Sequence, residues 1–177
     1  MSNKIWEFTG ETKIHLGTTL KRIRAAVGFE LKCGVVIGKG KLGGWIEKES
    51  NLSGNAWVSG DAWVYGNAEV SGSAEVSGSA KVYGNAKVYG NAEVYGNAEV
   101  YGNAEVKSSE DYCVYKNTWS SFRWFTYTRS NKMWSVGCFH GTGAELIAKA
   151  YKDGEKSGKC YEAIVKAQEA IEKEMEV

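Results

Sequence analysis

The chain is poor in the residues from which most metal-binding and catalytic sites are built. Its 177 residues include only two histidines, and its four cysteines are widely spread with no Cys-x-x-Cys pair. A structural zinc site usually needs closely spaced cysteines or histidines, so we expect no metal site. We expect the cysteines to be reduced thiols and the protein to require no cofactor.

Long apolar runs and an excess of charge are also missing. No apolar stretch reaches the roughly 18 residues that a membrane span needs, and the N-terminus lacks the apolar run of a signal peptide. We therefore expect a cytoplasmic protein without a membrane partner. Lysine and arginine number 22 against 21 acidic residues, so nucleic-acid binding through phosphates is not expected. Proline is absent altogether, and we have no physical account of that.

What the chain does contain is a six-residue repeat, written most cleanly as Val-Tyr-Gly-Asn-Ala-Glu, from residue 44 to residue 106. Every sixth residue is aliphatic, and a small residue stands two positions before it. Residues two apart on a strand share a face, so the small and aliphatic side chains point to the same side. Each unit is predicted to be one short strand. The aliphatic positions are Ile46, Leu52 and then valine at every sixth residue from Val58 to Val106.

From Leu52 to Val100, a glycine follows two residues after each aliphatic position, and Asn, Ser or Asp follows the glycine. These residues tolerate positive φ and bend the chain tightly, so each pair is predicted to form a corner. Three corners close a triangular coil of 18 residues, and residues 55–108 supply three coils. The pattern resembles the hexapeptide-repeat proteins, which implies a left-handed parallel β-helix. Periodicity alone leaves another solenoid handedness open.

The flanking segments divide the chain into three parts. Residues 1–43 contain strand-like runs and are predicted to form an N-terminal β cap, residues 44–108 the β-helix, and residues 109–177 a small C-terminal α+β module. In the module we expect an aromatic hairpin over residues 122–139, a helix over 144–151, a loop, and a helix over 159–175. That last helix has Cys160, Ile164, Ala167, Ile171 and Met175 on one stripe.

Glu11-Thr12, the run from Gly17 to Ala25, and Leu42-Gly43-Gly44-Trp45-Ile46-Glu47 lead into Asn51-Leu52. This opening resembles a group of phage and prophage hexapeptide-repeat proteins that are commonly labelled as transferases or left without an assigned activity. The segment from Cys33 to Lys41 is longer than the connection usual in that group. A phage origin would place the protein in the host cytoplasm.

Outward-facing residues carry the candidate interface. Stacking by 18 residues places Tyr65, Tyr83 and Tyr101 in one column, with Trp63 beside it, and the C-terminal module adds Trp124 and Tyr127. Such rings are enriched at protein interfaces, and threefold self-association is a common use of this fold. A homo-oligomer, with a trimer favoured, is therefore expected. The alternative is that the tyrosines simply stack on one another.

Three functions follow from these features. The first is a non-enzymatic interaction protein that binds and inhibits a host protein, such as a defence component. The second is an acyltransferase that uses acyl-CoA at an inter-subunit cleft, with His140 or His15 as the general base. The third is sequestration of a small nucleotide between subunits. Residues 44–106 contain neither a histidine nor a loop insertion, which favours the first function.

Overall fold

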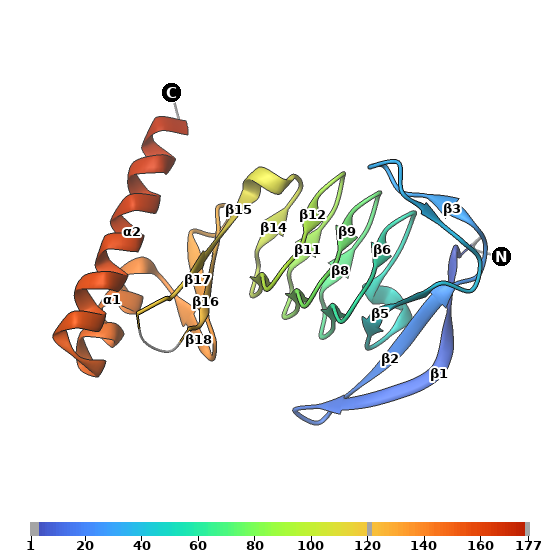
Figure 1. Ribbon diagram of the computed structural model, residues 1–177, viewed down its shortest axis with the longest axis horizontal. Coiled ribbons are helices and arrows are strands. Elements are labelled where there is room, and N and C mark those ends of the chain that lie inside the picture. Colours follow the sequence, from blue (N-terminus) through green and yellow to red (C-terminus); the bar gives the residue numbers. More distant parts are fainter. Residues whose placement is uncertain (1–3, 120–121, 176–177) are drawn as a thin grey trace.

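The computed structural model describes residues 4–119 and 122–175 (Figure 1). A β-solenoid of about three turns occupies the middle of the molecule, as the repeat predicts. An N-terminal β cap lies at one end, and a four-stranded sheet with two helices lies at the other.

The solenoid consists of nine two-residue strands that form parallel pairs. Each residue pairs with the one 18 positions further on, as in Val64 with Val82 and Val82 with Val100. The strands fall into three sheets, with orders β14-β11-β8, β12-β9-β6 and, continuing from the cap, β5-β7-β10-β13. Their bounds are β6 Trp57–Val58, β7 Trp63–Val64, β8 Glu69–Val70, β9 Glu75–Val76, β10 Lys81–Val82, β11 Lys87–Val88, β12 Glu93–Val94, β13 Glu99–Val100 and β14 Glu105–Val106.

Small and aliphatic side chains fill the inside of the solenoid. Every repeat alanine from Ala56 to Ala104 and every repeat valine from Val58 to Val106 is at most 1% exposed, which confirms the inward assignment of the two positions. The corners require glycine for two reasons: the backbone has a positive φ there, and the backbone of the next coil lies too close to leave room for a Cβ. At Gly72 the φ is +71°, and an added Cβ would lie 3.0 Å from the backbone nitrogen of Gly90 in the next coil.

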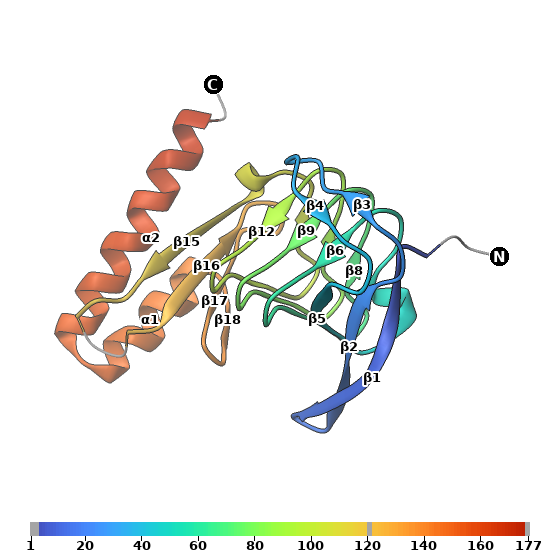
Figure 2. The same cartoon turned by 45° about the vertical axis from the view of Figure 1, so that its right-hand side comes forward.

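The N-terminal cap continues one face of the solenoid. Strands β1 (Trp6–His15) and β2 (Thr18–Ala25) form an antiparallel hairpin, and β2 pairs with β5 (Leu42–Ile46), which pairs in parallel with β7. A smaller hairpin, β3 (Phe29–Glu30) and β4 (Val36–Ile37), lies beside it. In Figures 1 and 2 the β1–β2 hairpin projects well beyond the coils.

One repeat unit departs from the prediction that every unit is a strand. The segment before Leu52 forms a 3₁₀ helix, η1 (Glu49–Asn51), and Leu52 makes only an isolated bridge to Val70. The reason is Asn51, whose buried side-chain amide donates to the carbonyls of Gly66 (3.2 Å) and Ala68 (2.8 Å). The side-chain amide of Asn51 thus supplies hydrogen bonds that the backbone N–H groups of a strand would otherwise make to the next coil.

The C-terminal module is an antiparallel sheet covered by two helices. The strands run in the order β15 (Tyr112–Lys116), β16 (Trp124–Thr128), β17 (Met133–Val136) and β18 (Phe139–Gly141). A short 3₁₀ helix, η2 (Ser109–Asp111), connects the solenoid to β15. Helix α1 (Gly143–Asp153) begins at a capping box formed by Thr142 and Glu145.

The last helix differs from the prediction. Helix α2 (Glu155–Met175) begins four residues earlier than expected, so most of the predicted loop is helical. Gly158 lies inside it because the ring of Tyr151 packs where a Cβ would stand. The buried face is Gly158, Tyr161, Val165 and Gln168 rather than the predicted stripe. From that stripe, Ile171 and Met175 are 44% and 51% exposed.

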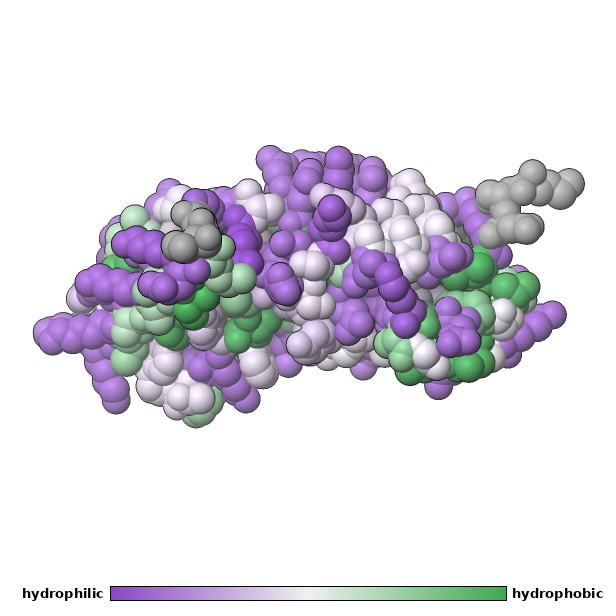
Figure 3. Space-filling view, turned by 90° about the horizontal axis from the view of Figure 1, so that it is seen from above, coloured by the Kyte–Doolittle hydropathy of each residue, from purple (hydrophilic) through white to green (hydrophobic). Residues whose placement is uncertain are grey.

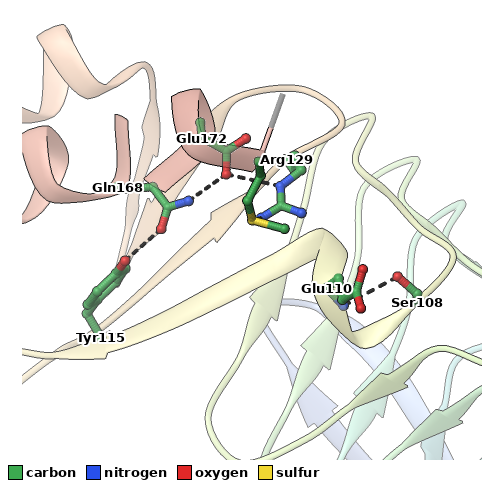
Figure 4. Close-up of polar contacts among 7 residues, drawn as sticks. Ser108, Glu110, Tyr115, Arg129, Gln168 and Glu172 are labelled. Atoms are coloured by element: carbon green, nitrogen blue, oxygen red, sulfur yellow. Dashed lines mark hydrogen bonds and ion pairs between the residues drawn. The ribbon is translucent and has the colours of Figure 1, made fainter. Parts of the chain in front are cut away.

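A chain of polar contacts attaches α2 to the sheet (Figure 4). The Tyr115 hydroxyl donates to Gln168 Oε1 (2.6 Å), and Gln168 Nε2 donates to Glu172 Oε1 (2.7 Å). Arg129 Nε donates to the same Glu172 oxygen (3.0 Å), which makes an ion pair. These partners satisfy the amide of Gln168, which is only 1% exposed.

Hydroxyl groups from the C-terminal module and its connection cover the open edge of the last coil. The backbone N–H of Glu99 donates to Thr126 Oγ1 (2.9 Å), and that of Glu105 donates to Ser130 Oγ (2.7 Å). The Tyr112 hydroxyl accepts from the Tyr95 N–H (3.3 Å) and donates to the Glu93 carbonyl (3.0 Å). Each hydroxyl replaces a backbone group that a further coil would have supplied.

Candidate functional site

The three tyrosines predicted to form a column do stack. The ring centroids of Tyr65 and Tyr83 lie 4.9 Å apart with an interplanar angle of 6°, and those of Tyr83 and Tyr101 lie 4.6 Å apart with an angle of 43°. Tyr101 is 37% exposed, whereas the other two rings are more buried. Burial raises the pKa of Tyr65 to about 12 and that of Tyr83 further in the same direction, so both stay neutral phenols.

Both histidines contact this column, one near each end. His140, on β18, stacks on Tyr101 with ring centroids 3.9 Å apart, and its Nε2 lies 3.0 Å from the Tyr83 hydroxyl. Its Nδ1 lies 3.1 Å from Ser135 Oγ. Burial lowers the pKa of His140, although the carboxylate of Glu99 opposes that effect. The neutral imidazole is therefore favoured, and both of its nitrogens already have partners.

His15, on β1, contacts the other end of the column. Its ring centroid lies 4.5 Å from that of Trp63 and 5.8 Å from that of Tyr65, in edge-on arrangements. The two candidate general bases are thus held against one aromatic surface by opposite ends of the chain. Spacing in the sequence could not have indicated this, because the contacts join residues 48 and 57 positions apart in the chain.

Trp63 also takes part in a cation–π cluster beneath the projecting hairpin. The Lys13 ammonium lies 4.1 Å from the Trp45 ring centroid and 4.2 Å from that of Trp63. Burial lowers the pKa of Lys13, but the two ring faces favour the charged ammonium. Lys13, together with His15, therefore fixes the hairpin over the solenoid face.

The two predicted interface residues of the C-terminal module have different surroundings. Trp124 is 37% exposed, with the Lys116 ammonium 5.0 Å from its ring centroid. Tyr127 is only 6% exposed and packs against Trp134 with ring centroids 5.0 Å apart. Tyr127 belongs to the core of the module, where a partner would not reach its ring.

Sequence reasoning missed the most exposed apolar side chains. Ile14 and Leu16, at the tip of the β1–β2 hairpin, are 78% and 90% exposed. Leu16 also has a φ of +47°, a conformation usually left to glycine or asparagine. The signal in the sequence was the pair Leu16-Gly17, because two-residue hairpin turns commonly have asparagine rather than leucine before the glycine.

Figure 3 shows where apolar surface gathers. Seen from this side, hydrophobic residues lie over the N-terminal cap and over the C-terminal module, and the coils between them are hydrophilic or neutral. At the cap, a cleft of about 740 Å³ is lined by apolar residues such as Leu31, Val35 and Ile37 and by charged residues such as Arg22 and Glu75. There the Cys33 thiol lies 3.7 Å from Glu75 Oε1, and burial raises the pKa of that carboxyl.

No protein-family model matches the chain, and no curated protein is significantly similar to it. Among the described residues, no three His, Cys, Asp or Glu side chains are placed to hold a metal ion. No helix in the described ranges is long and apolar enough to cross a membrane.

Proposed function

We propose that this chain is a non-enzymatic protein-interaction module whose main contact element is the projecting β1–β2 hairpin. The observation that carries the proposal is Leu16, which is 90% exposed and has a φ of +47°. A large apolar side chain there is unfavourable for the isolated chain, in both hydration and backbone conformation. Burial of Leu16 and its neighbour Ile14 in a partner would offset that cost.

The hairpin is suited to this role because one face of its tip is held against the solenoid while the opposite face is exposed to solvent. Lys13 between two tryptophans and His15 against Trp63 hold the strands in place, whereas Ile14 and Leu16 point away from these contacts into solvent. A fixed apolar tip loses little conformational entropy on binding, which favours affinity. Trp124 and Tyr101, each 37% exposed, offer further aromatic contact area.

We further propose that the solenoid is a left-handed hexapeptide-repeat β-helix of phage or prophage origin, and that its partner is a host protein that it inhibits. The resemblance of the opening segment to phage hexapeptide-repeat proteins supports this assignment. An experimentally determined structure would test the handedness directly, and a right-handed path of the coils would refute it.

Capture from a bacterial lysate tests the interaction. Tagged wild-type chain should retain a stoichiometric host protein, and Leu16→Asn should reduce the retained amount by about tenfold or more. Asparagine accepts positive φ readily, so the variant should melt at the wild-type temperature or slightly above it. Tyr151→Ser on helix α1, which removes a 40% exposed ring at the other end of the molecule, is the control and should retain the partner.

Light scattering on the same samples separates a foreign partner from self-association. If Leu16→Asn dissociates an oligomer of the purified chain, the hairpin tip contacts another copy. If wild type and Leu16→Asn retain the same proteins in the same amounts, the hairpin is not the contact element and the proposal fails.

A further inference from the structure

A pocket of about 350 Å³ lies where the last coil meets the C-terminal sheet. Three aromatic side chains, Tyr95, Tyr112 and Trp124, line it together with the polar residues Asn97 and Ser109. Its volume falls in the range of small-molecule sites, about 300–1,000 Å³. We call it the junction pocket.

The backbone of the last coil leaves a hydrogen-bond donor at this pocket. At the same corner of the earlier coils, the Asp61 N–H donates to the Gly78 carbonyl and the Ser79 N–H to the Gly96 carbonyl, each at 2.8 Å. Asn97 is the next residue in this series, but the chain turns into η2 before another coil can form. Within the described ranges its N–H has no backbone acceptor, and a Cβ built on Gly96 would meet nothing within 4 Å.

Two of the three aromatic side chains that line the pocket, Tyr95 and Trp124, are not required by the fold. Tyr95 is 58% exposed, and the equivalent positions in the two preceding coils are Ser59 and Ser77. A serine is therefore sufficient for this corner of the solenoid. Trp124 is 37% exposed, and the Lys116 ammonium lies 5.0 Å from its ring centroid.

We propose that the junction pocket binds a nucleobase, presented by a free nucleoside or nucleotide. The rings of Tyr95 and Trp124 offer stacking surfaces that accept any base. The Asn97 N–H donates to a carbonyl oxygen or ring nitrogen on the edge of the base, and the Asn97 amide and the Ser109 hydroxyl offer further donors and acceptors. This site lies within one chain, unlike a cleft between subunits, and does not depend on the hairpin interaction.

Saturation-transfer difference NMR on the full-length protein tests the site with adenosine and uridine as probes. We expect transfer to the base protons at millimolar nucleoside and a shift of the Asn97 amide resonance in a ¹⁵N spectrum. Tyr95→Ser and Trp124→Leu should each weaken binding by about tenfold or more, which is the usual effect of removing one stacking ring. Tyr151→Leu removes a comparably exposed ring on helix α1, outside the pocket, and should leave binding unchanged.

Tyr95→Ser keeps the proposal testable if Trp124→Leu fails to fold, because serine already occupies this position in two coils. Absence of transfer from both nucleosides would overturn the proposal, as would equal binding by wild type and Tyr95→Ser. Tighter binding of N-acetyltryptophanamide than of either nucleoside would also overturn it, and would assign the pocket to an aromatic side chain of a partner.

Discussion

At the residue scale, His140 is the side chain whose role the structure defines most closely. It joins the C-terminal sheet to the solenoid through a stack on Tyr101 and a contact with the Tyr83 hydroxyl. A neutral ring with hydrogen on Nδ1 fits both bonds, since Nε2 then accepts from Tyr83 and Nδ1 donates to Ser135. These contacts describe a structural role better than that of a general base awaiting a substrate.

The lowered pKa of His140 predicts a pH dependence of stability. Its folded-state pKa lies below the ordinary value of 6.5, so between the two pKa values the unfolded chain binds more protons than the folded chain. The free energy of unfolding therefore rises with pH in that window; the contribution is complete above about 6.5 and is lost as the pH falls. We expect the wild-type melting temperature to drop more between pH 7 and pH 5.5 than that of His140→Gln. Parallel curves for the two proteins would contradict this assignment.

At the scale of elements, the last coil is stable because hydroxyl groups replace the missing coil above it. The hydroxyls of Thr126, Ser130 and Tyr112 each accept a hydrogen bond from a backbone N–H of the last coil. An exposed strand edge invites pairing with other chains, and this arrangement covers it without a further strand. The sequence predicted a module at this end but not these contacts, because hydroxyl positions depend on how the module packs.

Tyr112→Phe tests this capping. The change keeps the ring but removes the hydroxyl that contacts the Tyr95 N–H and the Glu93 carbonyl, and Tyr112 is only 8% exposed. Leaving these groups without partners should reduce the free energy of unfolding by about 1–3 kcal/mol, measured by urea denaturation. Tyr95→Phe, which removes an exposed hydroxyl nearby, should change it by less than about 0.5 kcal/mol. Similar losses in both variants would argue against capping by Tyr112.

At the scale of the whole molecule, the solenoid separates two structurally different ends. The buried solenoid core extends from Trp6 in the cap to Tyr112 at the start of the module, and a second core around Phe125 and Trp134 lies between the C-terminal sheet and its helices. A repeat protein needs such ends because its terminal coils otherwise expose backbone groups and apolar surface.

Removal of residues 109–177 should show this requirement. The shortened chain loses every side chain of the module that covers the last coil, so its strand edges should pair with those of other copies. We expect large, heterogeneous assemblies by size-exclusion chromatography with light scattering, where the full-length chain gives one defined species at the same concentration. A shortened chain that remains a single species and melts cooperatively would show that the coils need no C-terminal cap.

The sequence by itself determined the solenoid. Side chains alternate between the two faces of a strand, and each six-residue unit ends in a glycine corner. The repeat therefore specifies which residues point inward, from Ala56 and Val58 to Val106, and which aromatic rings stack on the outside. Only the tertiary structure decided what those rings contact, which face of α2 is buried and where an aromatic pocket forms. The contact of Tyr83 with His140, for example, joins the repeat to the C-terminal module, which has no repeat. Such contacts depend on how the elements pack together and not on the spacing of residues in the sequence.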